Sequence, residues 1–192
     1  MARLIALPPC AAAPGSLRLF LSGVNPSELV QSNADAPAYQ GVDILWLILA
    51  TGETTNGQYS LMEQICPENS GPLPHTHTQR EMFYIMEGEI TFLVGDKTIT
   101  AGAGSFVNVP PGTVHSFRVD SETARVLNSY TPAGFERLII ETSQPAEAHT
   151  LPPKGLPPKA GMETMGHIFE EVGMTWLDAP DVLRDNKGPH TA

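Results

Sequence analysis

The chain has 192 residues, which is the length of one ordinary domain and excludes two large ones. Hydrophobic residues make up 41% of the chain and charged residues 17%, so there are enough apolar side chains for a packed core. Eleven Lys and Arg residues against 21 Asp and Glu residues give a net charge of −10. A chain this acidic repels phosphate backbones and anionic lipid surfaces, so we expect no nucleic-acid partner.

The N-terminal segment carries one basic residue and a few apolar ones before Pro8 and Pro9 interrupt it. This apolar stretch is too short for a secretory signal, so we expect a cytoplasmic protein. We accordingly expect its two cysteines, Cys10 and Cys66, to stay reduced. The longest apolar run, residues 44–50, is far shorter than the roughly 20 residues of a membrane-spanning helix, so we expect no membrane partner.

Eighteen prolines and 17 glycines divide the chain into short segments rich in Val, Ile, Thr, Phe and Tyr. This rhythm predicts an all-β sandwich or barrel of short antiparallel strands. The predicted strands, in chain order, are 17–21, 42–51, 58–66, 81–86, 89–94, 97–100, 105–109, 115–119, 124–131 and 136–141. Gly88 and the pair Gly95-Asp96 supply tight turns that are expected to join three of these strands as a meander.

The strand predicted around residues 42–50 is apolar on both faces, unlike the alternating strands near it. Its outer side must therefore be covered, either by a second subunit or by the terminal segments. Further along, residues 144–159 carry five prolines and are predicted to form an extended arm.

After this arm, apolar residues recur at helical spacing and predict a short amphipathic helix over residues 161–173. The stripe consists of Met162, Met165, Phe169 and Val172. Such a stripe is typical of packing and not of a cofactor site. His167 lies off the stripe and is expected at the surface.

The chain shows no internal repeat, so we predict one β domain with extensions. The expected organisation is an N-terminal arm with one strand over residues 1–41, a β domain over 42–141, and a Pro-rich arm with a C-terminal helix that packs on the domain over 142–192.

Residues 74–88 contain the first group of side chains that suit chemistry. His75, His77 and Glu81 are an even number of positions apart. Because side chains alternate faces along a strand, all three can point to one side of a single strand. A bulge between His77 and Glu81 would change this parity. Without one, two imidazoles and a carboxylate converge.

Residues 104–115 contain the second group: a strand, a Pro-Gly turn, and His115 at the start of the next strand. Pairing of these strands can bring His115 opposite the first trio. Three neutral imidazoles and one carboxylate suit a divalent first-row metal and leave one or two coordination positions open, as a catalytic metal requires.

These two stretches resemble the two sequence motifs of the cupin superfamily. The first motif is His-x-His, three or four residues, Glu, six residues and Gly, and it is met by His75, His77, Glu81 and Gly88. The second is Gly, five residues, Pro-x-Gly, two residues, His, three residues and Asn, and it is met by Gly104, Pro110, Gly112 and His115.

The chain departs from the cupin pattern at two positions that are not ligands. Val119 stands where the second motif ends in Asn, and Gly71 lies nearer to His75 than the leading glycine of the first motif usually does. Over residues 42–140 the wider pattern looks like small single-domain quercetin dioxygenase-like cupins, through segments 49–54, 81–88 and 131–136.

The resemblance implies a double-stranded β-helix, an antiparallel sandwich or barrel, and a homodimer. It also implies one divalent transition metal, which can be iron, nickel, cobalt, manganese, copper or zinc, held by the four residues His75, His77, Glu81 and His115. The partners it implies are a small aromatic substrate and O2.

If the chain acts as a quercetinase does, a flavonol binds the metal through its 3-hydroxyl group, Glu81 accepts the proton, and ring cleavage by O2 expels carbon monoxide. Phe83 and Ile85 share parity with Glu81, and Phe117 shares parity with His115, so these side chains are expected to line an apolar pocket. Tyr59 and Trp46 are further candidates for the same pocket.

Two other functions remain open. One is a non-oxidative isomerase, cyclase or decarboxylase that acts on a small metabolite, with the metal as a Lewis acid. The other is a cupin that binds a small molecule without converting it. No helix pair typical of DNA binding accompanies the strands, which disfavours a transcriptional sensor. Oxygen consumption distinguishes the dioxygenase from both.

Overall fold

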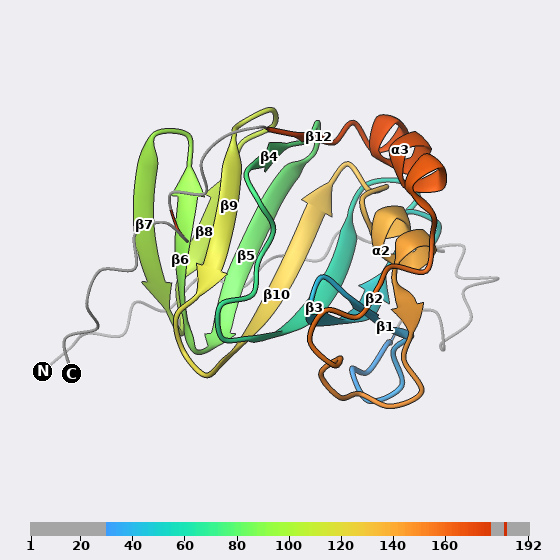
Figure 1. Ribbon diagram of the computed structural model, residues 1–192, viewed down its shortest axis with the longest axis horizontal. Helices are drawn as coiled ribbons and strands as arrows, with labels where there is room; N and C mark the ends of the chain where they lie inside the picture. Colours follow the sequence, from blue (N-terminus) through green and yellow to red (C-terminus); the bar gives the residue numbers. More distant parts are fainter. Residues whose placement is uncertain (1–29, 178–182, 184–192) are drawn as a thin grey trace, which may run out of the picture.

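Two antiparallel β-sheets form the framework of the described chain, which comprises residues 30–177 and Leu183 of the computed structural model (Figure 1). The prediction of an all-β sandwich is confirmed. The strand predicted over residues 17–21, and Cys10, lie outside the described residues. Within the part of the chain that is described, no helix is both long and apolar enough to cross a membrane.

The larger sheet has seven strands in the described chain. Their spatial order is β11 (Gln144–Pro145), β1 (Ala38–Gly41), β2 (Ile44–Ala50), β3 (Ser60–Pro67), β10 (Thr123–Thr131), β5 (Arg80–Glu87) and β8 (Phe106–Val109). The smaller sheet has five, in the order β12 (Thr175–Trp176), β4 (His75–Thr76), β9 (His115–Val119), β6 (Glu89–Val94) and β7 (Lys97–Gly102). Alternate residues of β10 are buried, as expected for a strand with one face toward a core.

The predicted meander is wrong at Gly88. β6 and β7, joined at Gly95 and Asp96, do form a hairpin, but β5 and β6 belong to different sheets. Gly88 therefore carries the chain from one sheet to the other. Its φ is 86°, and a Cβ there would lie 2.4 Å from the carbonyl oxygen of Thr123, so this crossing requires glycine.

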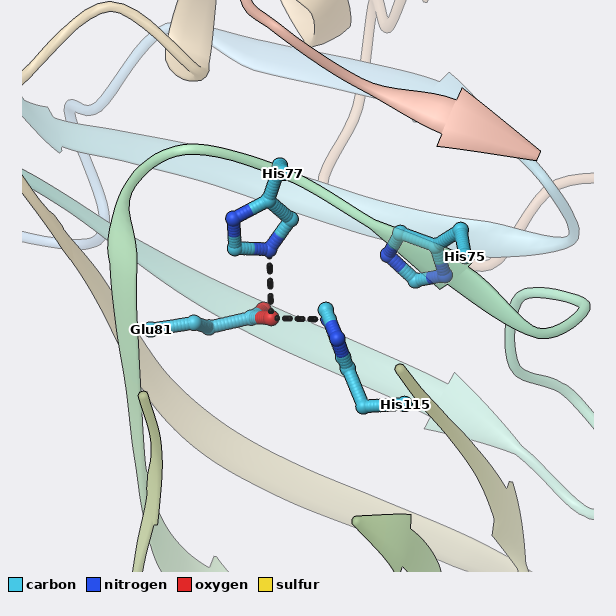
Figure 2. A group of neighbouring side chains, drawn as sticks. All are labelled: His75, His77, Glu81 and His115. Carbon is cyan, nitrogen blue, oxygen red and sulfur yellow. Dashed lines mark hydrogen bonds and ion pairs between the residues drawn. The ribbon is translucent and has the colours of Figure 1, made fainter. Parts of the chain in front are cut away.

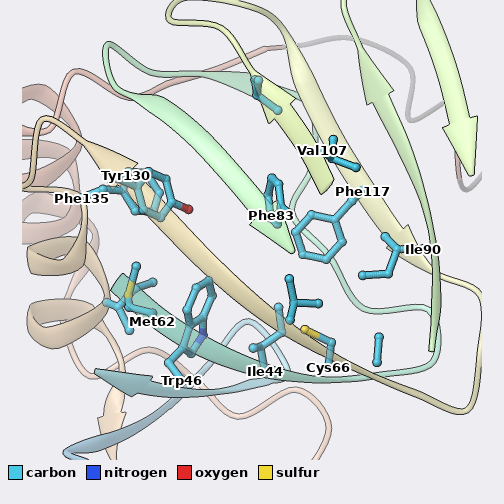
Figure 3. Close-up of a cluster of buried hydrophobic side chains, with 14 of the residues drawn as sticks. Ile44, Trp46, Met62, Cys66, Phe83, Ile90, Val107, Phe117, Tyr130 and Phe135 are labelled. Atoms are coloured by element: carbon cyan, nitrogen blue, oxygen red, sulfur yellow. The ribbon is translucent and has the colours of Figure 1, made fainter. Parts of the chain in front are cut away.

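The inner faces of the two sheets pack against each other through aromatic and aliphatic side chains (Figure 3). Phe83 of β5 and Phe117 of β9 lie with their ring centroids 5.7 Å apart in an edge-to-face arrangement. Both rings are nearly fully buried. Contact of this kind stabilises the sandwich at the place where its two sheets meet.

The outer face of β2 is covered by the chain itself. Leu45 and Leu47 are buried in a small second cluster that includes Ala36, with Ala146 and Leu151 packed against it. Of the two covers expected from the sequence, the segment after the β domain is the one observed. The homodimer stays a prediction.

The strand predicted over residues 136–141 is wrong, because the segment forms helix α2 (Glu136–Thr142). Its apolar run is too short for periodicity alone to distinguish a strand from a buried helix. The helix places Leu138 and Ile139 inward, while Arg137 and Glu141 form an ion pair of 3.0 Å one turn apart on its exposed side.

The C-terminal part of the described chain follows the prediction more closely. Residues 146–161 form neither helix nor strand, and α3 (Met162–Glu171) lies within the predicted helical range. His167 is exposed, as expected. Figure 1 shows α3 beside α2 and β12 close to β4, so the end of the described chain returns to the sandwich.

Candidate metal centre

Four side chains converge between the two sheets (Figure 2). His75 on β4 is paired with His115 on β9 in the smaller sheet, whereas Glu81 lies on β5 in the larger sheet. His77 lies on the segment that connects β4 to β5. One ligand atom from each residue lies within 4.8 Å of the others, and all four residues are buried. The two sequence motifs therefore meet.

The first trio does not lie on a single strand, contrary to the prediction from parity. The chain leaves β4 after Thr76 and enters β5 at Arg80, so His75 and Glu81 belong to different sheets. The connecting segment is fixed by the Pro-Gly turn of the second motif, because the Gly112 N–H donates to the His77 carbonyl at 2.8 Å. The side chains converge across the sandwich, and not along a strand.

The three imidazoles are oriented by the backbone. Their Nδ1 atoms lie 2.8, 3.0 and 2.8 Å from the carbonyl oxygens of Leu73, Gln79 and Thr113 respectively. A carbonyl oxygen only accepts, so each Nδ1 carries the proton. The other ring nitrogen, Nε2, then points away from these carbonyls, where it can donate to a carboxylate or, once deprotonated, bind a metal. Histidine ligands of metals are held in this way.

The two carboxylate oxygens of Glu81 have different surroundings. Oε2 lies 3.1 Å from His77 Nε2 and 2.9 Å from His115 Nε2. Oε1 accepts hydrogen bonds from the Tyr130 hydroxyl at 2.5 Å and from the Asn128 side-chain amide at 3.0 Å. One oxygen is thus held by the larger sheet, and the other faces the imidazoles.

The electrostatics keep the carboxylate ionised and one imidazole neutral. Burial disfavours the charge of Glu81, but hydrogen bonds with His115 and His77 outweigh it and hold the pKa of Glu81 well below its usual range. Burial, reinforced by His115, lowers the pKa of His75 to about 4. Burial opposes the charge of His115 as well, yet its hydrogen bond to Glu81 raises its pKa.

The four donors fit a divalent first-row metal. Three imidazole nitrogens and one carboxylate oxygen are directed into a common buried space, and backbone carbonyls already fix the histidine tautomers. The ionised carboxylate supplies the negative charge that partly offsets a cation. This donor set does not by itself choose among the six metals named above.

A second group of residues, which sequence reasoning missed, holds Glu81 in place. Asn128 accepts a hydrogen bond of 2.9 Å from the Gln64 side chain and donates to Glu81. Tyr130 stacks on Phe135 with ring centroids 4.1 Å apart and planes 8° from parallel (Figure 3). The available signal was parity: Asn128 and Tyr130 share the inward face of their strand with Val126, and a polar residue on a core face needs a partner.

The candidate metal centre forms one side of a pocket of about 100 Å³ with mostly apolar walls. Of the side chains expected to line it, Trp46, Phe83 and Phe117 do so. Ile85 lies fully inside the core and Tyr59 is 43% exposed at the surface, and neither lines the pocket.

Other walls of the pocket come from the two helices and the segment after them. They include Phe135, Leu138, Ile139, Met165, Phe169, Met174 and Trp176. Met165 and Phe169 belong to the stripe that the sequence indicated as packing alone, and Met162 of that stripe is 83% exposed. The helix turns part of its apolar face toward the pocket, since α3 lies beside α2 at that end of the sandwich (Figure 1).

Comparison with known proteins identifies the fold family. Residues 62–130 match the cupin domain model. The chain contains a cupin domain. A predicted oxalate decarboxylase from Thermotoga maritima has a similar structure, with a TM-score of 0.50 and 18% identity over 54% of this chain and 98% of the other. At that identity the likeness concerns the fold alone.

Curated relatives of this cupin carry different activities. Quercetin 2,3-dioxygenase from Bacillus subtilis is 30% identical over 148 residues, which are 77% of this chain and 43% of that enzyme. Thiopurine S-methyltransferase from Shewanella amazonensis is 29% identical over 124 residues, which are 62% of this chain and 56% of that enzyme. The chain spans about half the length of the curated relatives it matches. The reaction must therefore be argued from the site.

Proposed function

We propose that this cupin is a metal-dependent dioxygenase that cleaves a flavonol or a similar enolisable aromatic molecule with O2. The observation that carries the proposal is that a buried group of three histidines and one carboxylate lines a pocket with aromatic walls. The likeness to the Bacillus subtilis quercetin 2,3-dioxygenase supports the same reaction class.

The pocket binds an apolar planar molecule by excluding water from it. Phe83, Phe117 and Trp46 supply flat apolar surface, and few polar groups interrupt it. The substrate hydroxyl is directed to the centre because the polar atoms gather there. A bound divalent metal would acidify that hydroxyl and bring it close to O2.

Glu81 is the proposed general base. Its Oε2 faces the imidazoles, where a substrate hydroxyl would lie, so an ionised carboxylate is within reach of the proton to be accepted. Tyr130 and Asn128 hold Oε1, so the carboxylate does not rotate away from the pocket. In the overall reaction both atoms of O2 enter the cleaved product, and one ring carbon leaves with its oxygen as carbon monoxide.

The test is to purify the protein, measure its metal content, and follow O2 uptake and carbon monoxide release with a panel of flavonols. The expected result is bound metal with equal consumption of O2 and release of carbon monoxide. Glu81→Gln is expected to lose turnover while some metal stays bound, because an amide ligates weakly and takes up no proton. Wild-type turnover in that variant would exclude Glu81 as the base.

The size of the pocket favours a second candidate function. At about 100 Å³ it is smaller than the roughly 300 Å³ at the low end for sites of drug-sized ligands. A non-oxidative isomerase, cyclase or decarboxylase for a small metabolite would fit that space. Bound metal without O2 uptake on any flavonol would favour this second function.

A further inference from the structure

The described chain returns to the metal centre after the Pro-rich arm and covers the pocket. We call residues 161–177, which contain α3 and β12, the C-terminal wall. Trp176 of β12 is paired with His75 of β4, and their ring centroids lie 5.3 Å apart. Phe169 of α3 contacts Trp176 edge to face at 5.9 Å. The wall thus places two aromatic rings over the pocket, one of them directly against a candidate ligand.

The middle of the wall is anchored in the sandwich, because Ile168, Val172 and Met174 are buried in the main core. Its end at β12 is attached more lightly. β12 contributes two residues to the edge of the smaller sheet, and the Leu177 N–H donates to the Pro74 carbonyl at 3.1 Å. The Gln79 side chain donates to the Val172 carbonyl at 3.1 Å. These bonds all join the wall to the segment around the histidine pair of the first motif.

The β12 end of the wall buries little of its own surface. Both of its residues are exposed, and Trp176 is 41% exposed. The wall follows residues 146–161, which form neither helix nor strand. Because β12 has exposed side chains and only a two-residue edge pairing, it belongs to the part of a structure that opens at low cost.

We propose that the C-terminal wall opens at its β12 end to admit the substrate and that Phe169 and Trp176 determine the size of the aromatic molecule that fits. This inference rests on the proposed function for its substrate class. With the wall in place the pocket offers about 100 Å³, which is too little for a three-ring molecule. Displacement of the Trp176 ring enlarges this space. Binding of a three-ring aromatic molecule then requires that β12 moves first.

A reversible lock tests the movement. Thr76 and Thr175 are paired across β4 and β12, and their side chains face away from the pocket because His75 and Trp176 face into it. Directly opposed residues in antiparallel strands lie about 4.5–5.5 Å apart at Cα, which a disulfide can span. The variant carries Thr76→Cys and Thr175→Cys together with Cys10→Ser. The last change prevents a disulfide between Cys10 and either introduced cysteine, and the remaining native cysteine, Cys66, is buried.

Two rates report on the lock without use of catalytic turnover. The first is removal of zinc from the zinc-loaded protein by EDTA, and the second is binding of quercetin under nitrogen, followed by quenching of protein fluorescence. Oxidation of the pair is expected to slow both rates about tenfold or more relative to the same protein in reductant. Equal rates in the oxidised and reduced forms would overturn the proposal.

Variants of the two rings test the size limit. Phe169→Ala and Trp176→Ala are expected to strengthen binding of a three-ring flavonol relative to a one-ring catechol by about tenfold, because they enlarge the pocket. Trp176→Phe should retain most of the wild-type preference. Met162→Ala, on the exposed side of the same helix, is the matched control. A uniform change for both ligand sizes would refute the specificity role.

The outcomes separate the two proposals. Slow zinc removal in the locked protein, with no O2 uptake on any flavonol, would retain the movable wall and reject the dioxygenase. Stoichiometric carbon monoxide release, with zinc removal unaffected by the lock, would support the dioxygenase and reject the movable wall.

Discussion

The hydrogen bond from Tyr130 to Glu81 gives the sharpest test of how the metal centre is built. Tyr130→Phe removes only the hydroxyl that donates to Oε1 at 2.5 Å, and it keeps the ring that stacks on Phe135. Because no cavity forms, the loss is confined to one buried hydrogen bond to a charged group, which is worth about 1.5–3 kcal/mol. At 1.4 kcal/mol per factor of ten, we expect metal affinity to fall roughly 10- to 100-fold.

The assay is a competition titration of the metal-free protein with a chromophoric chelator. Tyr84→Phe is the control, because Tyr84 lies on the outer side of β5 and is 45% exposed. It should bind metal as the wild type does. An affinity for Tyr130→Phe within a factor of about two of the wild type would mean that Oε1 needs no donor, and the assignment of the two carboxylate oxygens would then be incorrect.

Three further predictions concern the same region. His77→Ala is expected to lose bound metal, measured by elemental analysis of the purified protein, and full occupancy would contradict the ligand assignment. Metal affinity should fall as the pH is lowered from 8 to 6, because the raised pKa of His115 lets protons compete for its Nε2; a flat titration would show that this nitrogen is not a ligand. Gly71→Ala should lower the melting temperature by roughly 5 °C or more, since a Cβ at φ 137° would lie 2.0 Å from a backbone oxygen, and an unchanged melting curve would rule out that close approach.

The convergence of the four candidate ligands could be predicted because the two motifs constrain local spacing and the turn that precedes His115. Their distribution over two sheets could not, since the break between Thr76 and Arg80 depends on which strands lie beside them. Parity along one strand therefore selected side chains that do converge, but by an incorrect geometry. In contrast, Asn128 could have been found, because a buried amide on an alternating strand already calls for a partner.

The short elements α2 and β12 could not be predicted from local sequence patterns. The apolar run in α2 is as compatible with a strand as with a helix until its neighbours are known. The place of Trp176 beside His75 results from a two-residue strand pair between segments about a hundred residues apart in the chain, and nothing local encodes it. On the central strands, parity accordingly predicted the pocket residues Phe83 and Phe117, but it also selected Ile85, which is buried without lining the pocket. It gave no information on the segment that covers the pocket.

Two of the ligand-bearing strands run directly into the aromatic core. Phe83 comes two residues after Glu81, Phe117 comes two residues after His115, and the two rings touch between the sheets. A substitution that changes the packing of either phenylalanine is therefore expected to move the backbone that carries a candidate ligand. Variants of this core made for thermal stability should be tested for metal affinity as well as for melting temperature.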